Sequence, residues 1–224
     1  CSNGGSGEFA SNYQLSITEQ IESAKAKVSN KIKNGKYIAY FQSFTNTYGD
    51  IEYLRKIFTE AINHPDIVAL SIGTRPDCLP DDILELLDFL NHIKPVWVEL
   101  GLQTIHERTA KYINRGYKLD IFDTAVSDLT KRNIEVIVHL IIGLPFETKE
   151  DILKSVQYVC SQPISGIKLQ LLHVLKNTPL EKEYFLNKFK ILSLQEYSNI
   201  LAECLCNIPP HIVIHLSLIH ISEP

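Results

Sequence analysis

The sequence lacks the features that mark membrane proteins and proteins that bind nucleic acid through bulk charge. None of its apolar runs reaches the roughly 18 residues that a membrane span requires, and no charged-then-apolar leader opens the chain, so we predict a cytoplasmic protein without membrane contact. The formal net charge of −4 excludes a positive electrostatic field over the whole protein. It is compatible with a local basic patch that binds a folded RNA. Methionine is absent, even at position 1, so we expect the chain to be a fragment.

Cysteine is scarce, and its spacing excludes a zinc site of the usual kind. The chain holds five cysteines, and four of them lack the paired spacing of zinc ligands. These four are Cys78, Cys160, Cys204 and Cys206. We interpret them as small buried thiols, because free cysteine packs like a small hydrophobe. Cys1 stands apart, at the head of a Gly/Ser-rich stretch.

What the sequence does contain is a regular alternation of apolar runs and helical periods. Hydrophobic residues make up 45% of the 224 residues, which is enough for a substantial core, and the length favours one α/β domain. The predicted strands are 37–41, 67–72, 96–100, 134–142, 164–175 and 212–215. The predicted helices include 16–33, 119–131, 148–159, 179–189 and 193–206. Apolar strands separated by helices are typical of a parallel sheet, whose ligands bind at the carboxyl ends of the strands.

Two polar residues follow the strand predicted at 96–100. Gln103 carries a neutral amide that both donates and accepts, which suits a ribose hydroxyl, and Arg115 suits a carboxylate. The pair is typical of a site for a nucleoside that bears an amino acid. In the alternative interpretation, Gln103 caps a helix and Arg115 is a solvated cation at a helix end.

These residues lie in segments that resemble a known family. The run 98–104, Val-Glu-Leu-Gly-Leu-Gln-Thr, and the run 114–116, Asn-Arg-Gly, resemble radical S-adenosylmethionine (SAM) enzymes, particularly the catalytic subunit of Elongator and its bacterial relatives. In the wider superfamily, which includes oxygen-independent coproporphyrinogen oxidase, the matching Gln and Arg contact the ribose and the carboxylate of SAM. The resemblance therefore implies these roles for Gln103 and Arg115.

A second segment is similar to the Elongator subunit. The run 74–78, Thr-Arg-Pro-Asp-Cys, matches it just before the strand that leads to Gln103. Arg75 and Asp77 flank a turn that Pro76 fixes, where they either form an ion pair or present the guanidinium to an anionic substrate. A purely structural turn is an equal alternative.

The resemblance also assigns cofactor contacts at other strand ends. Ser43 and Thr45 lie where the superfamily usually has a Gly-Gly-Glu-like motif that receives the SAM amino group, although they are also ordinary turn residues. Gly143, Leu144 and Pro145 match the second half of the superfamily's Gly-x-Ile-x-Gly-x-Pro pattern, which lies on the adenine side of SAM.

Two further positions belong to this set. His139 stands where some members of the superfamily carry an acidic ribose ligand, and a buried core histidine is the alternative. Leu172 lies at the end of the following strand, which in the superfamily packs on adenine. Together with the other strand-end residues they imply one SAM-binding mouth.

The two ends of the chain carry separate expectations. Cys1 fits the last of three cysteines that hold a [4Fe–4S] cluster, so two cluster ligands and the first strand would precede it. The residues 216–224 match an in-frame translation of a sequencing adapter. We therefore assign 1–215 to a partial radical SAM core and 216–224 to a non-native tail.

The implied fold is α/β, a partial, N-terminally truncated (β/α)6 TIM-like radical SAM barrel. The implied activity is reductive cleavage of SAM at a [4Fe–4S] cluster to give a 5′-deoxyadenosyl radical. A protein such as flavodoxin or ferredoxin would supply the electron. The resemblance leaves the substrate open, with tRNA as one candidate. We expect the chain as given to be inactive. The alternatives are a cluster-free TIM-like lyase using His139 or a carboxylate, and a non-catalytic SAM- or RNA-binding module.

Overall fold

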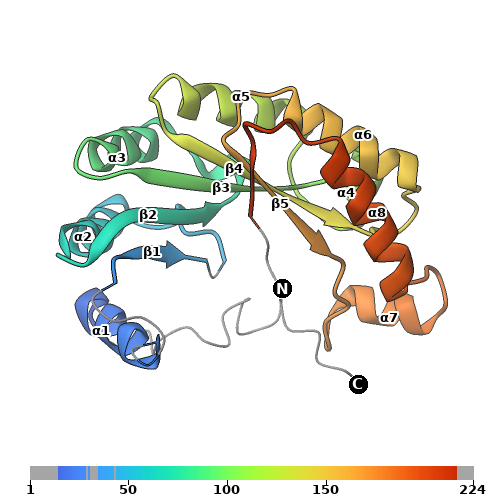
Figure 1. Ribbon diagram of the computed structural model, residues 1–224, viewed down its shortest axis with the longest axis horizontal. Helices are drawn as coiled ribbons and strands as arrows, with labels where there is room; N and C mark the ends of the chain where they lie inside the picture. Colours follow the sequence, from blue (N-terminus) through green and yellow to red (C-terminus); the bar gives the residue numbers. More distant parts are fainter. Residues whose placement is uncertain (1–14, 29, 31–34, 43, 216–224) are drawn as a thin grey trace.

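The computed structural model describes residues 15–28, 30, 35–42 and 44–215 and shows a curled, all-parallel sheet with helices around its outer face (Figure 1). The sheet has six strands in the order β1-β2-β3-β4-β5-β6. The strands are β1 (Tyr37–Phe41), β2 (Ile67–Thr74), β3 (Val96–Gln103), β4 (Glu135–Ile142), β5 (Gly166–Leu171) and β6 (Val213–Ile214). The expected α/β partial barrel is confirmed.

The helices follow the strands in the alternation that the sequence predicts. They are α1 (Ile17–Val28), α2 (Ile51–Asn63), α3 (Asp81–Asn91), α4 (Glu107–Tyr112), α5 (Leu119–Thr130), α6 (Lys149–Cys160), α7 (Pro179–Phe185) and α8 (Leu194–Cys206), with a short 3-10 helix η1 (Pro76–Cys78) after β2. Helix α6 begins with a capping box, in which Thr148 and Asp151 exchange side-chain and backbone hydrogen bonds. The described helices are all too short or too polar to cross a membrane.

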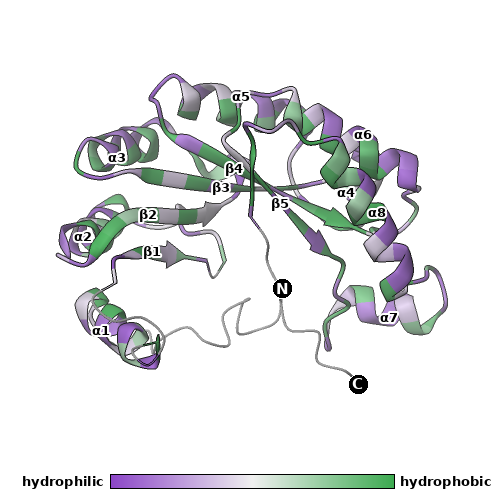
Figure 2. Ribbon diagram, in the orientation of Figure 1, coloured by the Kyte–Doolittle hydropathy of each residue, from purple (hydrophilic) through white to green (hydrophobic). Residues whose placement is uncertain are grey.

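The core lies between the outer face of the sheet and the helices that cover it. Phe58 on α2, Leu87 on α3 and Phe122 on α5 are fully buried there, together with Val98 and Val138 on the strands. Figure 2 shows hydrophobic residues concentrated along the strands and on parts of the helices. Burial of this apolar face holds the strand ends in fixed positions relative to one another.

Some predicted boundaries differ from the observed ones. Helix α7 ends at Phe185 instead of residue 189, because Asn187 takes a left-handed backbone with φ of 54°. Strand β3 runs on to Gln103, past the predicted end at residue 100. Gln103 is therefore the last residue of β3 and does not cap a helix.

Candidate functional site

Five neighbouring strands each contribute one polar side chain to a single hydrogen-bonded group, here called the inner network. Its members are Tyr40 (β1), Ser71 (β2), Glu99 (β3), His139 (β4) and Lys168 (β5). The Nζ atom of Lys168 lies 3.2 Å from the hydroxyl of Tyr40. The first and fifth strands of a curled sheet meet in this way only across its concave face, so the inner network lies inside the half-barrel.

The carboxylate of Glu99 is the centre of the inner network. Its Oε1 accepts a hydrogen bond from Ser71 at 2.6 Å. Its Oε2 accepts from the Tyr40 hydroxyl at 2.8 Å, from Nε2 of His139 at 2.6 Å and from Nζ of Lys168 at 3.0 Å. The side chains of Glu99 and Lys168 are only 5% and 10% exposed, so the two residues form a buried ion pair. The carboxylate of this pair accepts four hydrogen bonds, which offset the cost of burying its charge.

Protonation in the inner network follows from burial and from these contacts. Burial opposes ionisation of Glu99, but the hydrogen bonds and charges of His139, Ser71 and Lys168 outweigh it and hold its pKa well below the usual range. Burial lowers the pKa of His139, and the nearby Lys168 ammonium adds to this effect against the attraction of Glu99. At neutral pH the group therefore holds an anionic Glu99 and a neutral His139.

The strand-end residues lie one tier above the inner network. On β2 to β5, the residue four positions after the network member is the last residue of the strand or the first one after it. These residues, here called the strand-end rim, are Arg75, Gln103, Gly143 and Leu172. Four residues of strand span about 13 Å, so the half-barrel offers two separate levels to a ligand.

Gln103 has the features of a ligand-binding residue on the strand-end rim. Its backbone is left-handed, with φ of 70°, and its Oε1 is a buried oxygen without a hydrogen-bond partner. A Cβ atom at Gly101 would lie 2.8 Å from Nε2 of Gln103, so the amide packs directly against this glycine and would have to shift if residue 101 carried a side chain. A strained residue with an unpaired buried acceptor is uncommon in a region with a structural role alone.

Arg115 is buried beside this residue and does not point into bulk solvent. Its side chain keeps 2% of its exposure, and its guanidinium donates to the carbonyl of Thr104 at 2.6 Å, to the carbonyl of Tyr117 at 3.0 Å and to Glu107 at 2.8 Å. The Tyr117 ring lies under it, 4.7 Å away, and the Tyr117 hydroxyl donates to the carbonyl of Gly101. Arg115 therefore fixes the turn that follows Gln103.

Arg75 and Asp77 form the ion pair that the sequence allowed. The guanidinium of Arg75 binds both carboxylate oxygens of Asp77, at 2.9 and 2.6 Å. Arg75 also lies 5.7 Å from the centre of the Tyr117 ring, on the same ring that carries Arg115. Asp77 lines a groove of about 940 Å³ between η1, α3 and α5, on the outer side of the sheet.

The predicted adenine wall is built mainly from backbone. Gly143 has φ of 87°, a value that favours glycine, and Leu144 and Pro145 are buried directly behind it. Leu172 donates its backbone N–H to the carbonyl of Ile142, which keeps the ends of β4 and β5 level. The side of Gly143 that a Cβ would occupy faces Leu192.

The remaining predicted residues are partly outside the described chain. Thr45 is half-buried in the loop after β1, which Asn46 pins by donating to the carbonyls of Phe41 and Gly73. Ser43, Cys1 and the tail 216–224 fall outside the described residues, so their predicted roles stay predictions. Sequence patterns did not single out Glu99 or Lys168, although each is the one charged residue of its strand.

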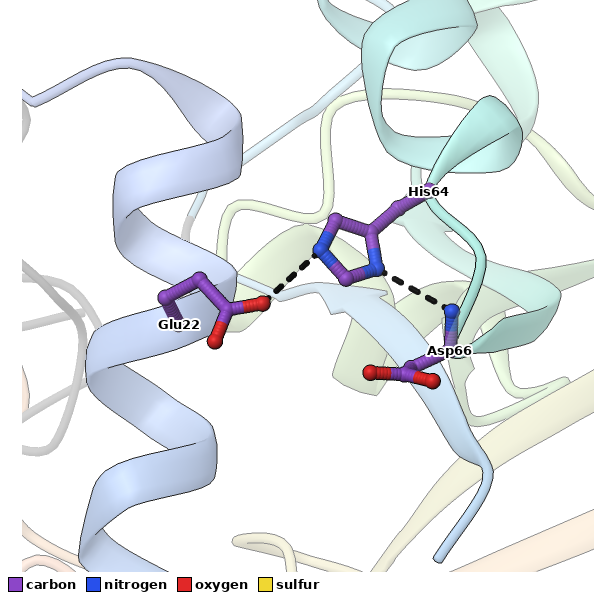
Figure 3. Close-up of side chains that lie close together, drawn as sticks. All are labelled: Glu22, His64 and Asp66. Carbon is purple, nitrogen blue, oxygen red and sulfur yellow. Dashed lines mark hydrogen bonds and ion pairs between the residues drawn. The ribbon is translucent and has the colours of Figure 1, made fainter. Parts of the chain in front are cut away.

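The described residues contain one group with the composition of a metal site, formed by Glu22, His64 and Asp66 (Figure 3). Nε2 of His64 lies 3.0 Å from Glu22, and Nδ1 of His64 accepts from the Asp66 backbone. The ammonium of Lys25 lies 2.7 Å from both carboxylates. Both carboxylates are therefore already paired with a cation, and the group ties α1 to the start of β2.

The chain is similar to members of a known protein family over most of its length. The family described as "Radical SAM superfamily" matches residues 1–159, and "Radical_SAM C-terminal domain" matches residues 164–221. YtqA of Bacillus subtilis (strain 168) is 43% identical over 215 residues, which cover 96% of this chain and 67% of YtqA. The tRNA uridine(34) acetyltransferase of Dehalococcoides mccartyi is 27% identical over 161 residues, which cover 70% of this chain and 34% of that protein.

The solved structure of the archaeal Methanocaldococcus infernus Elp3 has the same fold. It superposes with a TM-score of 0.80 at 19% identity, over 95% of this chain and 54% of that one. The chain covers only part of these longer proteins. Their activities are therefore considered for this chain only as proposals. From the family match over most of its length and the identity to YtqA, the chain belongs to the radical SAM superfamily.

Proposed function

We propose that this chain forms the core of an enzyme that binds SAM at the strand-end rim and uses it, with a [4Fe–4S] cluster, to start radical chemistry on a substrate inside the half-barrel. The observation that carries the proposal is the unpaired, buried Oε1 of Gln103. An acceptor in this position needs a donor from a ligand, because an unsatisfied buried oxygen is costly. A ribose hydroxyl supplies that donor.

The surrounding residues fit a flat nucleoside. Gly143 directly follows β4 and has no side chain of its own, and Leu172 offers an apolar edge at the end of β5. Arg115 uses three of its N–H groups on the protein and retains others for the SAM carboxylate. Ser43, Thr45 and His139 remain proposed contacts of the SAM amino group and ribose.

When bound, the cluster and SAM supply reductive cleavage to methionine and a 5′-deoxyadenosyl radical that removes hydrogen from the substrate. Cys1 is the proposed cluster ligand of this chain. The described cysteines do not replace it, since Cys78 lies on η1, Cys160 on α6, and Cys204 and Cys206 on α8. Of these four, which the sequence predicted to be buried thiols, Cys204 is buried, Cys78 and Cys160 are half-buried and Cys206 is exposed. The electron would come from a reductant such as flavodoxin or ferredoxin.

The substrate that we propose is an RNA. A 27%-identical relative bears the name tRNA uridine(34) acetyltransferase, which supports a uridine in tRNA as a candidate substrate. The net charge of −4 gives no general attraction to RNA, so specific contacts must supply the affinity. Arg75 is a proposed phosphate contact, although its ion pair with Asp77 would first have to open.

Binding of S-adenosylhomocysteine tests the SAM site without the cluster. We expect Gln103→Asn, which keeps the tolerance for a left-handed backbone but shortens the amide, to weaken binding about tenfold, the loss of one good hydrogen bond. Gln195→Asn on the exposed face of α8 is the matched control and should bind like the unchanged protein. If Gln103→Asn and Gln195→Asn bind S-adenosylhomocysteine with equal affinity, Gln103 does not contact the ligand and its assignment to the SAM site is wrong.

A further inference from the structure

The outer side of the half-barrel carries the groove between η1, α3 and α5, here called the outer groove (Figure 1). Its volume of about 940 Å³ is within the range of ligand-binding clefts. Most of its lining is apolar and includes Pro76, Leu79, Ile83, Leu84 and Ile121. The outer groove therefore offers apolar surface on the side of the sheet that faces away from the inner network.

Hydrogen bonds between two loops hold one wall of the outer groove. The Thr47 hydroxyl donates to the carbonyl of Cys78, so the hydroxyl of Thr74 donates to Thr47, at 2.6 Å. Thr47 is 3% exposed, and the ring of the buried Pro76 restricts the backbone of η1. A ligand would therefore meet a wall that is already ordered, which lowers the entropic cost of binding.

Two large side chains that line the outer groove are exposed. Tyr48, in the loop after β1, is 82% exposed, and Ile121 on α5 is 39% exposed. Single exposed hydrophobic residues are ordinary, but large ones that gather around one apolar groove mark an interaction site. Tyrosine in particular is enriched where protein interfaces concentrate their binding energy. The outer groove therefore has the features of a docking site for another protein.

The two helices beside the outer groove carry charge of one sign. Together they have seven carboxylates and no lysine or arginine. The formal net charge of the whole chain is −4, so the remaining residues are net positive and the negative charge is concentrated here. The carboxylates are Asp81, Asp82, Glu85 and Asp88 on α3 and Asp120, Asp123 and Asp128 on α5.

Asp82 lines the outer groove and is available to a cation. Asp77 and Asp128 also line it, but they have ion-pair partners in Arg75 and Lys131. Within the described part of the chain, Asp82 accepts a hydrogen bond only from a backbone N–H, that of Ile83 in its own helix. A cation from a partner would therefore find an exposed carboxylate at the edge of the apolar surface.

We propose that the outer groove binds a segment of another protein that presents apolar side chains flanked by lysine or arginine. The apolar side chains pack against Tyr48, Leu84 and Ile121, and the cations lie over Asp82 and the acidic helices. Burial of apolar surface supplies the affinity, whereas the charges attract the partner and reject acidic ones. The inference goes beyond the proposed function, because SAM is assigned to the strand-end rim.

Fluorescence anisotropy with labelled model peptides tests this on the 224-residue chain. The probe is a peptide of leucine and lysine with a helical repeat, which has one apolar and one cationic face. One control peptide has glutamate in place of lysine, and the other has serine in place of leucine. We expect the leucine–lysine peptide to bind, and both control peptides to bind at least about tenfold more weakly.

Substitutions locate the binding site. Tyr48→Ala should weaken binding of the leucine–lysine peptide about tenfold. Tyr53→Ala is its matched control, because Tyr53 is 60% exposed on α2 and does not line the outer groove. Asp82→Asn should weaken binding about threefold at low salt and less at high salt. Glu150→Gln, which removes a charge from the first turn of α6 as Asp82→Asn does from that of α3, should have no effect.

Three results would overturn the proposal. The first is that the leucine–lysine peptide does not bind, and the second is that a control peptide binds as tightly. The third is an equal loss of binding in Tyr48→Ala and Tyr53→Ala, both of which should stay folded because the two rings are exposed. Sedimentation of the protein alone tests for another occupant. A dimer that Tyr48→Ala dissociates and Tyr53→Ala retains would show that a second copy fills the outer groove, and would also overturn the proposal.

Discussion

Replacing Glu99 with glutamine should destabilise the protein strongly, because four donors converge on its carboxylate. In the amide, one oxygen is kept and the other becomes an NH2 group that faces donors. The Lys168 ammonium, 10% exposed, is left without its counter-charge. Removing one partner of a buried ion pair typically costs about 3–5 kcal/mol, and we expect a loss of this size in the free energy of unfolding.

Urea unfolding followed by circular dichroism measures the effect. The double substitution Glu99→Met with Lys168→Met is the matched comparison, since it removes both charges together and should recover most of the loss. A loss below about 1 kcal/mol for Glu99→Gln would show that the carboxylate is solvated or the ion pair absent, and would refute this description of the inner network.

The loss of stability caused by Glu99→Gln should depend on pH. The pKa of Glu99 lies below its ordinary value of 4.5 in the folded protein, so its ionised form favours folding. That contribution is fully present above pH 4.5 and is lost as the pH falls through the folded pKa. The difference in stability between the unchanged protein and Glu99→Gln should therefore shrink below pH 4.5. A difference that stays constant down to the acid transition would contradict the lowered pKa.

Two further substitutions test other parts of the description. Thr148→Ala removes the capping box of α6 and should lower the free energy of unfolding by about 1 kcal/mol in urea titrations, whereas no change would mean that the cap is made by water. Lys25→Met should lower the melting temperature because Glu22 and Asp66 lose their shared cation, while EDTA should leave the unchanged protein's melting temperature as it is. Stabilisation by added zinc in the unchanged protein would contradict this assignment.

Much of the fold follows from local patterns in the sequence. The apolar runs at 37–41 and 67–72 became β1 and β2, and the capping signals at Asp50 and Thr148 mark the starts of α2 and α6. Such features depend on residues near one another in the chain, so short-range rules find them. Resemblance to a family also rests on short runs of residues, and it drew attention to Gln103 at the end of β3 and to Arg115 after α4.

The inner network could not be found in this way. Its members are separated by up to 128 positions, as Tyr40 and Lys168 are, and only the curl of the sheet brings them together. Strands buried on both faces show no clear alternation, so a sequence does not reveal which side Glu99 faces. The left-handed backbone of Gln103 is likewise set by the meeting of β3 with Tyr117 and Arg115, and glutamine itself gives no sign of it.

The four-residue step between the strand-end rim and the inner network has a consequence for how such proteins diversify. Gly101 and Gly143 shape the strand ends through the backbone, whereas the inner network is made by side chains of separate strands. Exchanging His139 or Lys168 would rearrange the hydrogen bonds around Glu99 while the strand ends at Gly101 and Gly143 keep their shape. An insertion inside a strand would disrupt the inner network, since a shift by one residue turns every side chain to the opposite face.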